Sequence, residues 1–147
     1  MIKQMPGAAG EERWVSNRGE LRIRRPTPLV LVYVESGFLE AAFAPLISRA
    51  MDATLRTPGK PLFFVDAEDL EGYDATIRAE ASDWIKKHGA RIATQHMLVK
   101  SRLTKMGLAV VSMLLGGVIV GHDKRRTFDA ALREAIFTTQ RQAAQPL

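Results

Sequence analysis

The residues with the greatest potential for chemistry form a cluster of carboxylates in one short stretch: Asp66, Glu68, Asp69, Glu71 and Asp74. Clustered oxygen ligands suit calcium or magnesium, and paired carboxylates suit general acid–base catalysis. The spacing does not match an EF-hand loop, because Leu70 occupies what would be a ligand position. Asp74 is explained by capping alone, as a residue before a helix whose carboxylate accepts amide hydrogens. A solvated, capped loop is therefore favoured, and a partner-docking surface is the main alternative.

A second charged group lies at the expected start of a later helix, where Lys100, Arg102 and Lys105 crowd together. Cations at a helix N-terminus oppose the helix dipole, so the arrangement invites an anion. In a parallel sheet the acidic stretch and these cations fall at the same edge. We favour an internal ion pair, Asp66 or Asp74 with Lys100 or Arg102, over a phosphate-bearing ligand.

The other reactive side chains do not form a recognisable catalytic, metal-binding or phosphate-binding motif. His88, His96 and His122 have no common register, which makes core or surface roles more plausible than metal ligation. The serines lack a nucleophile-elbow context. Gly116-Gly117 is not followed by the lysine and serine of a phosphate-binding loop. The sequence therefore predicts a protein that is not an enzyme, with no cofactor and no metal.

Composition sets the broad class. The chain has 147 residues, 46% apolar and 25% charged, which is typical of one soluble domain. The net charge of +5 is scattered, so nucleic-acid binding is not expected. Cysteine is absent and the first residues lack an apolar signal region, which favours the cytoplasm. The longest uncharged run, 106–121, is short for a membrane span and contains a glycine pair, so no membrane span is expected.

The chain divides into a disordered lead (1–11), a single domain (12–137) and a frayed tail (138–147). Two short strands with a turn between them open the domain as a hairpin, with Leu21 and Ile23 facing inward. Apolar runs and helical periodicities then alternate. The predicted strands are 29–34, 62–65, 91–99 and 118–120, and the predicted helices are about 37–56, 75–88, 102–115 and 127–137. Ser36-Gly37 is expected to end the first of these strands, and 66–73 is expected to be a loop. This order predicts an α/β fold with a mixed, mostly parallel sheet.

The order of elements and several stretches resemble the STAS domain family, the fold of SpoIIAA-like anti-sigma-factor antagonists. The resemblance covers roughly residues 13–136 and rests on LVLVYVESG, LFFVDAEDLEGYDATI, ATQHMLV, MGLAVVSMLLGG and VIVGHDKRRTFDAAL. Signalling members of the family carry a phosphorylatable serine or threonine in an Asp-Ser-Ser-Gly-like tetrad. Asp74-Ala75-Thr76-Ile77 matches the aspartate and one hydroxyl, which makes Thr76 a candidate acceptor. Ser101 is the second candidate, although Lys100 stands where the family has the aspartate.

The resemblance implies a non-enzymatic protein-interaction module in bacterial signalling, similar to an anti-sigma-factor antagonist or a stressosome component. Its partner would be a kinase-like or sigma-regulatory protein, or a second copy of the chain in a homo-oligomer. The predicted partner-binding residues are Asp66, Glu68, Asp69, Tyr73, Asp74, Lys100 and Arg102. Small residues in 106–117 either pack on the sheet, as we favour, or form a self-association face. The alternative is a lipid- or small-anion-binding module of the CRAL-TRIO-like type, which requires a concave apolar pocket.

Overall fold

A seven-stranded mixed sheet, with its strands in sequence order from β1 to β7, forms the centre of the molecule. The computed structural model describes residues 1–102, 104–107, 113 and 116–144. The pairings from β1 to β4 are antiparallel, and those from β4 to β7 are parallel. The predicted fold class, α/β with a mixed sheet that begins as a hairpin, is confirmed.

The antiparallel half consists of the strands β1 Lys3–Met5, β2 Glu11–Val15, β3 Gly19–Thr27 and β4 Val30–Leu39. Alternation places Leu21 and Ile23 inward, where they are buried as predicted. The expectation of a disordered lead is wrong at Lys3–Met5, which pairs with β2. Ser36-Gly37 does not end β4, because the strand continues beside β3 and β5 to Leu39.

The rest of the chain supplies parallel strands and helices. The strands are β5 Leu62–Tyr73, β6 Thr94–Leu98 and β7 Ile119–His122. The helices are the 3-10 turn η1 Ala41–Phe43, α1 Ala44–Leu55, α2 Ala75–His88, the 3-10 turn η2 Gly89–Arg91, and α4 Arg125–Ala144. Pro45 lies in the first turn of α1, where the amide hydrogen that proline lacks is not needed.

Two of these elements are longer than predicted. The stretch 66–73 is not a loop, because β5 continues to Tyr73 alongside β4. The predicted frayed tail is helical from Thr138 to Ala144, because α4 continues to Ala144 and buries Thr139 against the sheet. Thr139 Oγ1 lies 2.8 Å from Thr27 Oγ1 of β3, which fixes this end of the helix.

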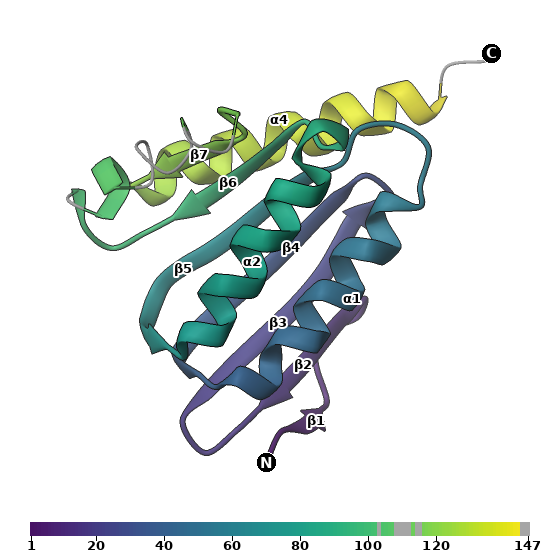
Figure 1. Ribbon diagram of the computed structural model, residues 1–147. Helices are drawn as coiled ribbons and strands as arrows, with labels where there is room; N and C mark the ends of the chain where they lie inside the picture. Colours follow the sequence, from purple (N-terminus) through teal and green to yellow (C-terminus); the bar gives the residue numbers. More distant parts are fainter. Residues whose placement is uncertain (103, 108–112, 114–115, 145–147) are drawn as a thin grey trace.

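Helices cover both faces of the sheet (Figure 1). The helices α1 and α2 lie on one face, which we call the cavity face, and α4 crosses the other, which we call the closed face. On the closed face, Phe64 of β5 and Phe128 of α4 meet edge to face with ring centroids 5.7 Å apart, and both are buried. The cavity face holds the larger core, with Phe63 packed edge to face against Trp84 of α2.

Candidate ligand-binding site

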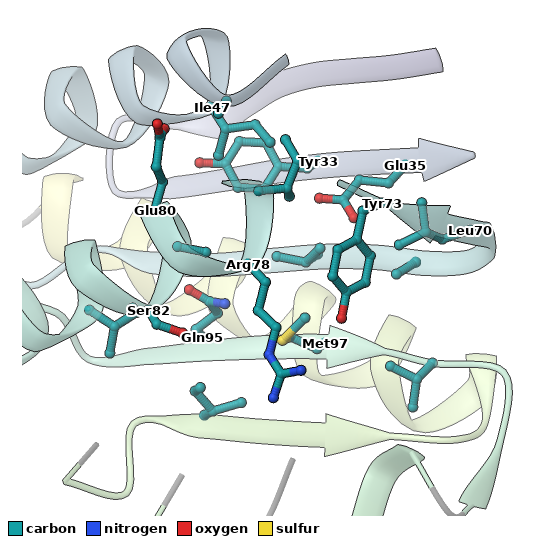
Figure 2. A pocket seen from close by; sticks show the side chains of 18 of the residues that line it. Tyr33, Glu35, Ile47, Leu70, Tyr73, Arg78, Glu80, Ser82, Gln95 and Met97 are labelled. Atoms are coloured by element: carbon teal, nitrogen blue, oxygen red, sulfur yellow. The ribbon is translucent and has the colours of Figure 1, made fainter. Parts of the chain in front are cut away.

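A cavity of about 540 Å³ lies on the cavity face, between the sheet and the two helices above it. This volume is in the range of small-molecule sites, roughly 300–1,000 Å³. The lining comes from β4, α1, β5, α2, β6 and β7, together with Val99, Lys100, Ser101, Thr104 and Gly107, and it is mainly apolar. Figure 2 shows this cavity from close by. Its apolar lining includes Ile47, Met51, Val65, Leu70, Ile77 and Met97.

Strand β4 contributes two polar groups to the cavity, Tyr33 and Glu35. Side chains of a strand alternate between its faces, so residues two apart share a face. The hydroxyl of Tyr33 is buried and has no hydrogen-bond partner among the residues that the structure describes. Burial raises the pKa of Tyr33 well above its ordinary value, and nearby Glu35 adds to the effect. An unpaired buried hydroxyl is costly, typically by about 1–3 kcal/mol, so Tyr33 is a group to which a ligand could bond.

Glu35 is the most perturbed carboxyl in the cavity. Its side chain is buried, and no hydrogen bond or ion pair reaches it within the described part of the chain. Burial raises the pKa of Glu35 to about 7, and the charge of Asp66 adds to the rise. The pairing of β4 with β5 shifts between Val34 and Ser36, at Glu35 itself. Such irregularities are frequent beside binding sites, because they change the direction of a side chain.

The opposite side of the cavity carries exposed cations. Figure 2 shows Arg78 extending from α2 in the direction of β6, where Gln95 and Met97 also line the cavity. Lys100 follows the end of β6, and both cations are exposed. Neither takes part in an ion pair among the described residues. Tyr73 lines this part of the cavity and is 43% exposed.

The acidic stretch does not pair with the cations that the sequence suggested. Asp66 and Glu68 point to the closed face. There Nη2 of Arg125 in α4 lies 2.8 Å from Asp66 Oδ2 and 3.2 Å from Glu68 Oε1. The hydrogen bond from Arg125 to Asp66 is the main reason that the pKa of Arg125 rises above its usual value. Lys100 lines the cavity on the other face. The predicted pairing of Asp66 with Lys100 or Arg102 is therefore wrong, because strand alternation separates the two charge clusters.

Asp74 occupies the N-cap position of α2, as predicted, but its carboxylate does not cap that helix. Asp74 Oδ2 accepts a hydrogen bond from the backbone amide of Ala41 at 2.7 Å. The carboxylate thus fixes the chain that leads from β4 into α1. It also does not pair with Lys100 or Arg102, so the second version of the predicted internal ion pair is wrong too.

The remaining predicted site residues are dispersed. Asp69 lies near the end of β5 and is exposed, and Arg102 is exposed. Thr76 lies exposed in the first turn of α2. Ser101 Oγ accepts a hydrogen bond from the amide of Thr104 at 3.0 Å, so Ser101 caps the next helical turn as predicted. The structure brings Tyr73, Lys100 and Ser101 to one cavity and sends Asp66 and Glu68 to the opposite face.

Two of the three histidines, His96 and His122, contact each other. His96 Nδ1 lies 2.8 Å from His122 Nε2, and His122 Nδ1 lies 2.9 Å from the hydroxyl of Thr127. That hydroxyl donates to the carbonyl of Lys124, so its oxygen accepts from His122, and His96 must donate to His122. Burial lowers the pKa of His96 to about 4, with His122 as the second cause, and burial also lowers the pKa of His122. This neutral chain ties α4 to β6 and β7.

The small-residue segment 106–117 is only partly described. The helical period of 102–115 predicts inward side chains at Leu103, Met106, Val110 and Leu114. Met106 is instead 60% exposed, and Met113 is 82% exposed. Leu103, Val110 and Leu114 lie outside the described residues. No described helix is long and apolar enough to cross a membrane. Within the same residues, no three acidic, histidine or cysteine side chains gather as a metal site would require.

Sequence reasoning missed Tyr33 and Glu35, the two polar side chains of β4 that line the cavity. The available signal was their position in LVLVYVE, where a tyrosine and a carboxylate alternate within an otherwise apolar strand. A carboxylate on a buried strand face needs a partner or a function. The predicted strand 29–34, with its end at Ser36-Gly37, hid this signal because it left Glu35 outside the strand.

Among solved structures, the chain is similar to an uncharacterized protein of the DUF3478 family with a SpoIIAA-like fold from Shewanella loihica PV-4. The TM-score is 0.64 at 15% sequence identity, and the match covers 80% of this chain and 98% of the other. No family model matches the chain, and no curated protein matches it. At this identity the likeness shows the fold alone, which is SpoIIAA-like, as the sequence resemblance implied.

Proposed function

We propose that this chain is a non-enzymatic binding module that holds a small amphipathic molecule between its sheet and the helices α1 and α2. The observation that carries the proposal is the cavity of about 540 Å³, mainly apolar, with Tyr33 and Glu35 as polar groups in its lining. Sites for small molecules combine an apolar lining with a few polar groups that fix orientation. This is the concave pocket that the lipid- or small-anion-binding alternative required.

The packing around the cavity supports the same function. The helix α2 carries Trp84 and Ile85 into the core, yet Ala81 of the same helix face is exposed and lines the cavity. Ala81, Trp84 and Ile85 follow the three-and-four spacing of one helical stripe, which predicts that they share a face. A helix that buries only part of its apolar face leaves the rest available to a ligand.

The test fills the cavity and measures binding of N-phenyl-1-naphthylamine, an apolar dye whose fluorescence rises in apolar surroundings. We expect the wild type to bind the dye and Ala81→Phe to lose most of the binding, because the new ring occupies the cavity. Ala79→Phe is the matched control, since Ala79 is an exposed position of α2 that does not line the cavity. Absence of dye binding to the wild type, or equal binding by the two variants, contradicts the proposal.

The second candidate is the protein-interaction function, for which the exposed end of β5 is the supporting observation. Asp69 and Glu71 are exposed there, Tyr73 is 43% exposed, and Thr76 lies nearby in the first turn of α2. Tyrosine is enriched in protein interfaces. A negative charge at Thr76 would change the electrostatics at the N-terminus of α2. In this form the module docks a kinase-like or sigma-regulatory protein in bacterial signalling.

An affinity pull-down from a bacterial lysate compares the wild type with Thr76→Glu and with the uncharged control Thr76→Gln. A partner that the wild type and Thr76→Gln recover and Thr76→Glu loses supports a charge-controlled docking edge. The same partners with all three baits contradict a switch at Thr76.

A further inference from the structure

We infer that the ligand of this cavity is an amphipathic amine, with its ammonium group held by Glu35 and its apolar part under α2. The inference rests on the proposed function, because it names the chemical class that the same cavity takes. Glu35 and Tyr33 are the polar side chains of β4 in this cavity, and the described residues provide no hydrogen-bond partner for the carboxylate of Glu35 or the hydroxyl of Tyr33.

An ammonium group satisfies Glu35. It offers three donors and a positive charge, so it can pair with the carboxylate of Glu35. A buried charge is costly in free energy when it has no partner, and adding or removing that partner changes the free energy by a large amount. A ligand cation at this place therefore supplies what Glu35 lacks.

The charges around Glu35 favour a cation over an anion. Asp66 of β5 is the charged neighbour that acts on Glu35; it is a carboxylate on the closed face, where it is paired with Arg125. On β3, the neighbour of Glu35 is Leu21, and α1 contributes no charged side chain to the described lining. The ionisable side chains of the described lining are Tyr33, Glu35, Glu71, Tyr73, Arg78, Glu80 and Lys100, so carboxylates outnumber cations.

The alternative of an anionic ligand depends on Arg78 and Lys100. Both are exposed, and exposed ion pairs contribute little, about 0–1 kcal/mol. Glu35 is buried, where the Coulomb interaction is screened less. An anion that entered far enough to bury its apolar part would also approach the carboxylate of Glu35. The buried carboxylate of Glu35 therefore favours a positively charged ligand.

Calorimetry with three probes of equal chain length tests the inference: octylamine, octanol and octanoate. We expect octylamine to bind the wild type at least tenfold more tightly than the other two at pH 8. An alkylamine stays protonated as a lysine side chain does, whereas Glu35 with a pKa of about 7 loses its charge on acidification. Affinity for octylamine should therefore fall about tenfold between pH 8 and pH 6, and binding at pH 6 should release a proton to the buffer.

Glu35→Gln is the matched variant, because it removes the charge and keeps the shape. It should lower the octylamine affinity about tenfold at pH 8, abolish the pH dependence and leave octanol binding unchanged. Tyr33→Phe should retain the pH dependence of octylamine binding. Octanoate or octanol binding as tightly as octylamine, or octylamine binding that Glu35→Gln does not change, overturns the inference and leaves the proposed function intact. Failure of all three probes overturns both.

Discussion

The two faces of the sheet are built from the same strands and differ in how their buried polar groups are hydrogen-bonded. On the closed face, the hydroxyls of Thr27 and Thr139 bond to each other, and His96, His122 and Thr127 form a continuous chain of hydrogen bonds. On the cavity face, the hydroxyl of Tyr33 and the carboxylate of Glu35 have no such partners among the described residues.

The closed face therefore contributes mainly to stability, and the cavity face is suited to binding. Paired polar groups add rigidity to the closed face, where the buried hydroxyl of Thr94 is an exception without a partner among the described residues. An unpaired group costs free energy that a ligand can recover. The longest helix, α4, closes the first face, and the shorter helices α1 and α2 leave a cavity on the second. The predictions below test this comparison, from the largest expected effect to the smallest.

Truncation of a large side chain should be much more costly on the closed face. Phe128→Ala removes a ring that is 1% exposed, and we expect it to lower the free energy of unfolding by about 3–5 kcal/mol. Ile77→Ala removes a half-buried side chain that lines the cavity, and we expect a loss of about 1 kcal/mol or less. Urea denaturation of both variants measures the difference. Equal losses would mean that the cavity face is as tightly packed as the closed face.

The pH dependence of stability should have opposite signs on the two faces. The folded pKa of Glu35 is about 7, above its ordinary 4.5, so the folded state holds the proton more tightly than the unfolded state. Its contribution is present below pH 4.5 and is lost as the pH rises to about 7, by roughly 3 kcal/mol.

The folded pKa of His96 is about 4, below its ordinary 6.5, so its contribution is present above pH 6.5 and is lost as the pH falls to about 4. We expect Glu35→Gln to remove the first dependence and His96→Asn the second. Denaturation between pH 4 and pH 8 measures both, and a wild-type profile that Glu35→Gln does not change would contradict the buried, unpaired state of Glu35.

Removal of one hydroxyl should have opposite effects on the two faces. Thr139→Val leaves Thr27 Oγ1 buried without this partner, and we expect a loss of about 1–3 kcal/mol. Tyr33→Phe removes a hydroxyl that is already unpaired, so we expect the free energy of unfolding to stay constant or to rise by up to about 1 kcal/mol. Thermal unfolding without ligand compares them. Destabilisation by Tyr33→Phe as large as that by Thr139→Val would indicate that Tyr33 has a partner.

Much of the fold could be predicted from the sequence, because it depends on local patterns. The alternation around Leu21 and Ile23 gave the hairpin strand, and the order of apolar runs and helical periods gave the α/β class. The boundaries were less predictable. Gly37 suggested the end of β4, yet the strand continues because Gly37 adopts a φ of +68° opposite Gly19, where a Cβ would meet the carbonyl of Arg18. Only pairing with β3 and β5 could reveal this.

The candidate site depended far more on tertiary structure. The sequence determined which side chains are acidic, basic or apolar and, through the alternation of β4, that Tyr33 and Glu35 share a face. It did not determine that this face lies under an incompletely packed helix pair, or that Asp66 and Glu68 turn away to Arg125. The physical reason is that ion pairs and burial depend on which distant elements pack against a strand face. Those contacts are set by the registers of β4, β5 and β6 and by the position of α4, which no local pattern specifies.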